Sequence, residues 1–196
     1  MSPSIDKSPI ELITTRRSVV AANMTDPGPS DDELNTIIAA GVRVPDKGRI
    51  GPWRIQIIRK DAQAKLGALY GKLFKEDNPD APDDLVEFNR DRPSRSPILL
   101  AITFHPDPER YVKVPHSEQI LSCGALCQNI LNGAHAMGFV AQWLTEWPAY
   151  HAEVKNALGH AAETEIVGFI HIGSATDAPQ ERKRVGAESV VSEWAG

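Results

Sequence analysis

Two groups of basic residues have the types and spacing needed to bind a phosphate group. Arg16, Arg17 and Ser18 place two guanidinium groups and a hydroxyl in consecutive positions, and Arg182 and Arg184 lie close together near the other end of the chain. Arginine suits phosphate because its planar set of N–H donors matches the phosphate oxygens. Considered alone, the second group is better explained as a solvated basic run paired with nearby acids. The residues therefore indicate an anion site without proving one.

Other chemistries that leave short sequence motifs are not supported. The sequence contains no Gly-x-Gly-x-x-Gly after a strand, no phosphate-binding Gly-x-x-x-x-Gly-Lys-Ser/Thr loop, no His-Glu-x-x-His and no Gly-x-Ser-x-Gly. The 6 histidines make no cluster at metal-ligand spacing, so we expect no metal site, and His171 is expected to be structural. Cys123 and Cys127, one helical turn apart, are expected to be core thiols rather than a redox pair.

The composition is that of an ordinary soluble globular protein. A chain of 196 residues suits one domain over residues 1–196 better than two, since separate domains usually need about 100 residues or more each. The net charge of −5 argues against nucleic-acid binding, which normally leaves a basic patch. The most apolar run, residues 120–137, contains polar residues and predicts a buried helix rather than a membrane span. With only 2 cysteines, a reducing cytoplasm is the expected location.

Hydrophobic periodicity and capping residues predict an α+β chain. Capping boxes at Ser8–Glu11 and Ser30–Glu33 predict two helix starts, because serine and glutamate satisfy backbone N–H groups reciprocally. Short apolar or alternating runs predict strands at 53–57, 97–104, 139–143 and 165–172. Further helices are expected at 62–74, 117–137 and 149–158. The acidic, proline-bearing stretch 76–84 is expected to be an exposed loop.

The helix expected at 117–137 also bears on the oligomeric state. It is apolar on most of its circumference, and a helix buried on nearly all sides in so small a protein indicates that a second subunit covers one face. We therefore expect two chains to pack through this helix.

Several separated segments together resemble the FMN-dependent nitroreductase family, nearest its compact subgroup of NAD(P)H nitroreductases. They are Arg16-Arg17-Ser18, residues 39–47 leading into Pro52-Trp53, residues 138–145, residues 166–173 and the basic pair of the tail. Each segment is weak alone, but their order and spacing match the family over about residues 8–194. The resemblance implies a nitroreductase-like sandwich, with a central, mainly antiparallel sheet flanked by helices, in an intertwined homodimer.

The resemblance also implies a cofactor, flavin mononucleotide (FMN), and residues that hold its phosphate. Arg16 and Ser18 would face the ribityl-phosphate side, and Arg182 and Arg184 would close over the phosphate from the tail. Arg17 belongs to the same motif, but side chains diverge at a helix end, so all three neighbours are not expected to reach the phosphate.

On the ring side, the resemblance assigns Trp143, Leu144 and Thr145 to the flavin edge near N5, the atom that takes hydride. Trp143 as a plain core residue is an equally good interpretation. Arg43 and Lys47 flank a loop that would run beside the ring. They are natural sources of positive charge near N1, although for Lys47 an exposed loop position is as good an interpretation. Which of the two would lie nearest N1 stays open.

Two positions depart from the family pattern. A basic residue customary two positions after the serine is replaced by Val20, which removes one expected positive contact with the reduced flavin. An amide residue customary before Pro52 is replaced by Gly51, so only backbone contact is possible there. Both departures concern the ring side of the site rather than the phosphate side.

The implied function is transfer of hydride from NADH or NADPH to a small oxidised acceptor, such as a nitroaromatic or a quinone, by a ping-pong mechanism. Flavin chemistry belongs to the ring, so no catalytic side chain is expected. The alternative is a flavin-binding protein that stores, senses or degrades FMN, and turnover of a nicotinamide donor would separate the two. A cofactor-free dimeric scaffold is a third possibility, which a flavin absorbance spectrum would test.

Overall fold

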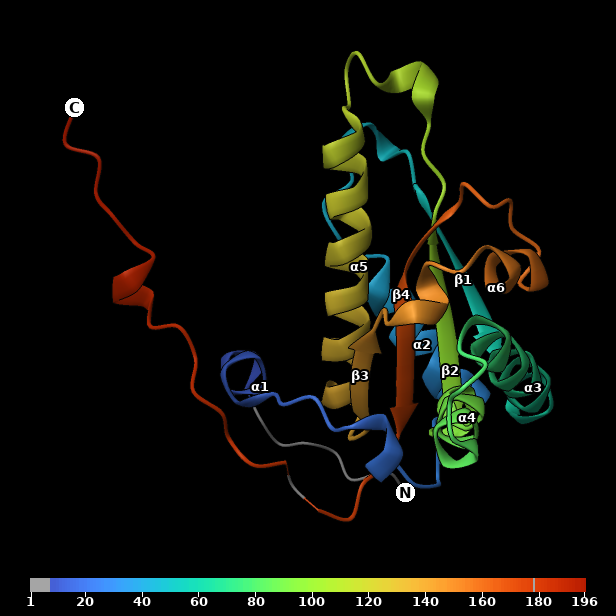
Figure 1. Cartoon of the computed structure of the whole chain (residues 1–196). Helices are drawn as coiled ribbons and strands as arrows, with labels where there is room; N and C mark the ends of the chain where they lie inside the picture. Colours follow the sequence, from blue (N-terminus) through green and yellow to red (C-terminus); the bar gives the residue numbers. More distant parts are fainter. Residues whose placement is uncertain (1–7, 178) are drawn as a thin grey trace.

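An antiparallel sheet forms the centre of the fold, as seen in a computed structural model that describes residues 8–177 and 179–196. Within these residues the sheet has four strands in the spatial order β1-β2-β4-β3 (Figure 1). The strands are β1 (Trp53–Ile58), β2 (Ile98–Phe104), β3 (Val140–Leu144) and β4 (Glu165–Gly173). Each neighbouring pair is antiparallel. The predicted strands and the antiparallel sheet are therefore confirmed.

Helices cover both faces of this sheet, which confirms the predicted α+β sandwich. The capping boxes form as expected, since the hydroxyls of Ser8 and Ser30 each accept a hydrogen bond from the backbone N–H of the glutamate three residues later. The helices are α1 (Pro9–Thr15), α2 (Asp31–Gly41), α3 (Lys60–Asp77), α4 (Asp83–Arg90), α5 (His116–Ala136) and α6 (Ala152–Ala157).

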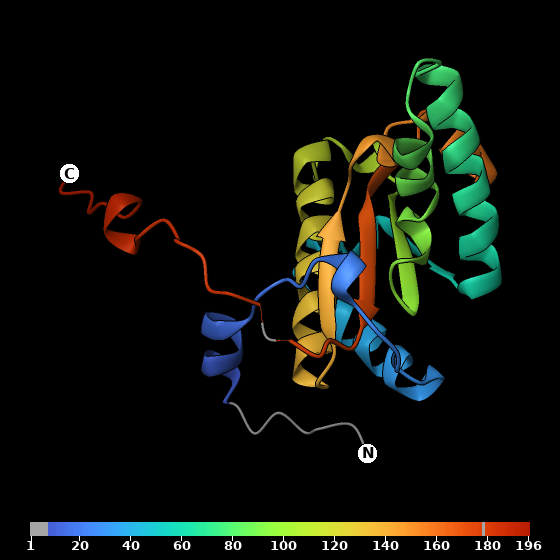
Figure 2. The ribbon, with the colours of Figure 1, turned by 60° about the horizontal axis from the view of Figure 1, so that its bottom comes forward.

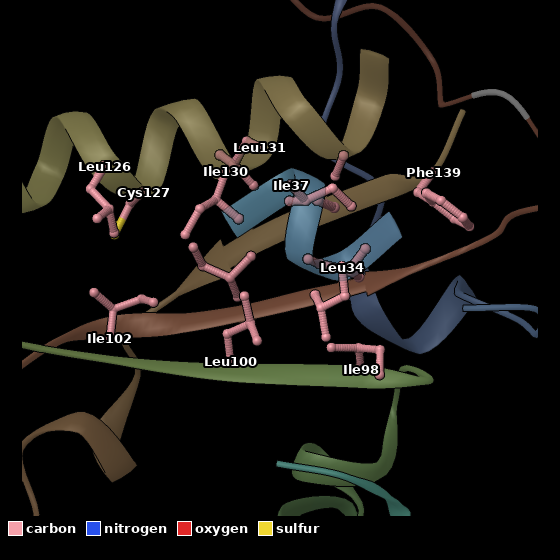
Figure 3. Packing of buried hydrophobic residues seen from close by; sticks show 14 residues of the cluster. Leu34, Ile37, Ile98, Leu100, Ile102, Leu126, Cys127, Ile130, Leu131 and Phe139 are labelled. Atoms are coloured by element: carbon pink, nitrogen blue, oxygen red, sulfur yellow. The ribbon is translucent and has the colours of Figure 1, made fainter. Parts of the chain in front are cut away.

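The central strand β2 divides the core into two layers. Its residues alternate between the two faces, as the period of two in a strand requires. Ile98, Leu100 and Ile102 pack with residues of α2 and α5 in one cluster (Figure 3). Leu99 and Ala101 pack with residues of α3 and α6 in the other. All seven residues of β2 are buried, so this strand holds both helical layers in place.

The stretch 76–84, expected to be one exposed loop, is a loop only over residues 78–82, and its two ends are helical. The helix α3 continues through Asp77, and α4 begins at Asp83, so only residues 78–82 connect the two helices. Acidic residues at the start of α4 stabilise it because they interact favourably with the partial positive charge of a helix N-terminus. Acidic residues and prolines are also typical of loops, so the sequence pattern does not reveal this helix start. The prediction of exposure holds, since Asp83 and Asp84 are exposed.

The long helix α5 leaves one side uncovered in a single chain. Leu121 of this helix is 71% exposed. Figures 1 and 2 show α1 and residues 179–196 extending away from the sheet on the same side of the molecule. The large apolar side chains exposed on these segments are Ile10, Ile13, Val185, Val190, Val191 and Trp194. Monomeric proteins seldom expose so many large apolar side chains on neighbouring segments.

Among the described residues, no helix combines the length and the hydropathy needed to cross a bilayer.

One titratable residue is buried in the sheet itself. His171 of β4 is 4% exposed, and its Nδ1 atom lies 2.8 Å from the hydroxyl of Ser96. Burial, with Arg95 as a second cause, lowers the pKa of His171 to about 4. The folded protein therefore keeps this histidine neutral where the unfolded chain would already bind a proton.

The free energy of unfolding should therefore fall as the pH drops below about 6.5, the ordinary pKa of histidine. Between pH 7 and pH 5 we expect His171 alone to account for a loss of about 2 kcal/mol, because only the unfolded chain takes up the proton. Urea unfolding of wild type and His171→Gln at both pH values measures this contribution. Equal pH dependence of the two proteins would contradict the assignment.

Candidate functional site

The segment that follows α1 presents the first group of predicted site residues. The helix ends at Thr15, and Arg16 leaves it in an extended conformation with φ −58° and ψ 131°. Successive side chains of an extended chain point in different directions. Arg17 and Ser18 line a cavity of about 610 Å³ together with Gln180 of the tail. As expected, the three neighbours do not all point the same way.

Arg16 is the most unusual of these residues. Its Nη1 atom is buried and has no hydrogen-bond partner among the described residues. Burial lowers the pKa of Arg16, and the positive charges of Arg184 and Arg17 lower it further. A half-buried guanidinium with one buried, unpartnered donor and two like-charged neighbours is electrostatically unfavourable unless an anion is added. This arrangement therefore fits an anionic group such as a phosphate.

The tail brings one carboxylate to the same cluster. Glu181 lies 3.7 Å from the guanidinium of Arg17 and 3.7 Å from that of Arg184. The side chain of Glu181 is 66% exposed, so these pairs are worth little. Arg17 also donates a hydrogen bond to the backbone carbonyl of Gln180 at 3.1 Å. Arg17 and Arg184 thus share one exposed carboxylate, which links the segment after α1 to the tail.

Arg182 occupies a more peripheral position. It is exposed, and its backbone N–H donates a hydrogen bond to the carboxylate of Glu181 at 2.9 Å. The positive charge of Arg184 lowers the pKa of Arg16, whereas Arg182 is not among the causes of this lowering.

Trp143 and Leu144 end β3, and Thr145 follows them. The indole N–H of Trp143 donates to the backbone carbonyl of Val167 at 3.1 Å, and the ring packs over Gly168, where an added Cβ would come within 2.0 Å of it. The side chain of Trp143 therefore packs against the core, and its backbone groups are available for other contacts. Leu144 and Thr145 line a small cavity of about 20 Å³.

Glu146, the next residue, has a backbone conformation that the sequence did not predict. Its φ of 48° and ψ of −176° lie in a region that glycine adopts easily and other residues avoid. Its carboxylate pairs with Arg92, which lies in a turn directly after α4. Neither residue belongs to a recognisable motif, so sequence reasoning missed both.

The structure places the remaining basic candidates elsewhere. Lys47 pairs with Glu118 at 2.7 Å, in the first turn of α5. Figure 1 shows α1, which Arg16 follows, near the opposite end of α5. Arg43 is exposed after α2, and its carbonyl accepts a hydrogen bond from Asn129 at 3.0 Å. A single chain therefore brings Arg16, Arg17 and Arg184 together but does not bring Lys47 to them.

The two cysteines lie away from these groups, in the core. Cys123 and Cys127 have no exposed surface, and burial raises the pKa of both thiols to about 12. Because the thiolate is the reactive form, both are inert core residues. The structure agrees with the expectation that they pack rather than react.

Known proteins resemble this chain both in sequence and in fold. A protein of Escherichia coli strain K12 named "Putative NAD(P)H nitroreductase YdjA" is 29% identical over 169 residues, which span 84% of this chain and 87% of that protein. A nitroreductase-like family protein from Bacillus cereus superposes with a TM-score of 0.83 at 21% identity, covering 98% of both chains. A mutant of NfnB from Sphigopyxis sp. strain HMH, described as an FMN- and NADPH-dependent nitroreductase, superposes with a TM-score of 0.76 at 18% identity, covering 97% of this chain and all of the other.

At these identities the two solved structures establish a shared fold. The sequence model of the nitroreductase family goes further, because it matches residues 13–174, most of the chain. The match includes the segment after α1 and the end of β3, and it stops before the tail arginines. It confirms the resemblance inferred from the separated motifs. This chain belongs to the nitroreductase family of oxidoreductases.

Proposed function

We propose that this chain binds FMN and transfers hydride from NADH or NADPH to a small oxidised acceptor such as a nitroaromatic or a quinone. The observation that carries the proposal is the half-buried guanidinium of Arg16, whose buried Nη1 donor has no partner among the described residues and which lies near Arg17 and Arg184. Such a cluster favours a doubly charged phosphate. The names of the relatives, an NAD(P)H nitroreductase and an FMN- and NADPH-dependent one, support the same cofactors.

The chain's own residues hold and orient the cofactor in this proposal. Arg16 and Arg184 bind the phosphate directly, and Arg182 adds charge from the exposed side. Arg17 has its donors partly occupied by Gln180 and Glu181, so it contributes mainly to the local field. Ser18 faces the ribityl-phosphate side of FMN. When bound, FMN supplies the hydride chemistry, and donor and acceptor use the same site in turn.

The ring edge is assigned to residues 143–145. Since the indole of Trp143 is held by Val167, backbone groups and the hydroxyl of Thr145 are the contacts available there.

We further propose that the site is completed by a second copy of this chain. The resemblance assigns Arg43 and Lys47 to the flavin, yet one chain holds Lys47 at the end of α5 remote from α1. A second chain seated on the uncovered side of α5 would bring its own loop to the first chain's arginines. The exposed Leu121 on this side fits such a contact. The proposed assembly is an intertwined homodimer.

We also propose a cellular location and partner molecules for this enzyme. One flavin-binding domain per chain, residues 1–196, is expected to work in the cytoplasm, where buried free thiols such as Cys123 and Cys127 are stable. The net charge of −5 does not favour nucleic acid as a partner. The partner molecules are therefore a second copy, the nicotinamide donor and a small acceptor.

Steady-state kinetics test the proposal against a role in storing, sensing or degrading FMN. The FMN-loaded protein should oxidise NADH or NADPH with a nitroaromatic or a quinone as acceptor. Double-reciprocal plots at several acceptor concentrations should be parallel, as a ping-pong mechanism requires. A protein that binds FMN without such turnover would support the storage role, and a protein that binds no FMN would contradict the proposal altogether.

A further inference from the structure

Glu146 is held in a backbone conformation that it would not adopt by itself. Its φ of 48° and ψ of −176° lie in a region of backbone conformation where the Cβ atom of any residue other than glycine meets steric hindrance. It directly follows Thr145, the last residue of the segment assigned to the flavin edge. Side chains from outside residues 143–149 must therefore hold this backbone in place.

Arg92 and Asn89 provide two anchors on either side of the strained peptide. The guanidinium of Arg92 donates a hydrogen bond to the carboxylate of Glu146. Asn89 accepts hydrogen bonds through its Oδ1 atom from Nε of Arg92 and from the indole N–H of Trp147, both at 2.8 Å. Asn89 is 1% exposed and belongs to α4. The side chains of two consecutive residues are thus fixed to one buried support.

The position of Arg92 is itself fixed. Its side chain is only 16% exposed, and its guanidinium lies 5.0 Å from the ring centre of Phe88. The carboxylate of Glu146 is more exposed, at 38%, so the ion pair adds little through charge alone. The ion pair acts mainly on geometry, because it links the strained backbone of Glu146 to the side chain of Arg92, which is itself held in place.

The space behind the segment shows why an anchor is needed. Leu144, Thr145, Glu146 and Arg92 line the cavity of about 20 Å³, with Tyr70 on its wall. A cavity of this size holds about one water molecule. Residues 144–146 are therefore not supported from behind by close apolar packing alone.

We propose that Arg92 is a positioning residue of the flavin site, acting through Glu146 to hold the backbone of residues 144–146 in the conformation that meets the cofactor. The inference rests on the proposed function for the identity of that cofactor. Arg92 does not itself need to touch FMN. Releasing a backbone conformation of this kind typically changes an equilibrium by roughly 5- to 150-fold.

Arg92→Met tests the inference, with Arg95→Met as the matched control. Both arginines lie over the ring of Phe88, but only Arg92 pairs with Glu146. Arg92→Met should weaken FMN binding at least ~5-fold. It should also move the midpoint potential of the bound flavin, at ~30 mV for each tenfold difference between the affinities for oxidised and reduced FMN. Arg95→Met should leave both near wild type. An Arg92→Met protein with wild-type affinity and potential would overturn the proposal.

A second substitution separates positioning from a plain loss of charge. Glycine adopts φ of 48° without an anchor, so Glu146→Gly should retain FMN within a few-fold of wild type although it lacks the carboxylate. Glu146→Gly combined with Arg92→Met should bind FMN more tightly than Arg92→Met alone. If Glu146→Gly is as damaging as Arg92→Met and gives no rescue, the charge rather than the backbone is what matters, and the proposal is wrong.

Hydrogen exchange of the FMN-free protein decides the inference independently of the cofactor. The peptide spanning residues 143–149 should exchange at least ~5-fold faster in Arg92→Met than in wild type, and at the wild-type rate in Arg95→Met. If wild type binds no FMN, the proposed function fails, while this comparison still reports on the anchor. Unchanged exchange in Arg92→Met would show that Arg92 does not hold the segment.

Discussion

Arg16→Ala is expected to weaken FMN binding by ~30- to several thousand-fold while leaving the FMN-free fold intact. Removing one partner of a largely desolvated charged pair typically costs ~2–5 kcal/mol. The FMN-free protein should not lose stability, because Arg16 makes no described hydrogen bond through Nη1 and is repelled by Arg184 and Arg17. Arg184→Ala should weaken FMN binding for the same reason. Arg17→Ala should have a smaller effect, since Gln180 and Glu181 already engage its guanidinium.

Fluorescence titration with FMN measures the dissociation constants, and urea unfolding of the FMN-free proteins checks the fold. Arg59→Ala is a suitable control, because Arg59 is a surface arginine paired with Asp31 before α3. Its dissociation constant should equal that of wild type. Unchanged FMN binding in both Arg16→Ala and Arg184→Ala would place the phosphate elsewhere.

Replacing Val190, Val191 and Trp194 together by serine is expected to raise the dissociation constant of the dimer by on the order of a thousandfold or more. Trp194 is 92% exposed in the single chain, and each large apolar side chain contributes ~1.5–3 kcal/mol when it becomes fully buried. Two symmetric tails double this contribution, and the conformational entropy that these side chains lose when they become ordered at the interface reduces it. The arginines of the tail are unchanged in this variant.

Light scattering at micromolar concentration measures the effect, with Leu85→Ser as a matched control. Leu85 is 42% exposed on α4, which Figure 1 shows on the side of the sheet away from α1 and the tail. Wild type and Leu85→Ser should be dimers, and the triple variant should dissociate. A wild-type monomer that still binds FMN would disprove the two-chain site, and a dimeric triple variant would exclude the tail from the interface.

Much of the fold follows from local sequence patterns because local interactions determine them. The serine and glutamate of each capping box are three residues apart, so the helix starts are visible in the sequence. The run of residues 98–104 is short and apolar apart from Thr103, as suits a strand covered on both faces. The helix α4 was missed because Asp83 and Asp84, which favour a helix N-terminus, are equally common in loops.

The candidate site was predictable where residues are adjacent and not where they meet through the fold. Arg16, Arg17 and Ser18 form a recognisable motif, and the structure brings Arg184 near the two arginines. Arg92 and Glu146 are 54 residues apart, and a glutamate gives no signal of positive φ. The sequence could not decide between core and cofactor contact for Trp143, because its role depends on the space that Gly168 leaves.

The two half-reactions, measured separately without oxygen, test the central claim most directly. One equivalent of NADH or NADPH per bound FMN should bleach the visible absorbance of the flavin, and a nitroaromatic or quinone added afterwards should restore it. This result requires that FMN is bound, that it takes hydride, and that donor and acceptor act in turn. An FMN-loaded protein whose absorbance neither nicotinamide donor bleaches would contradict the account.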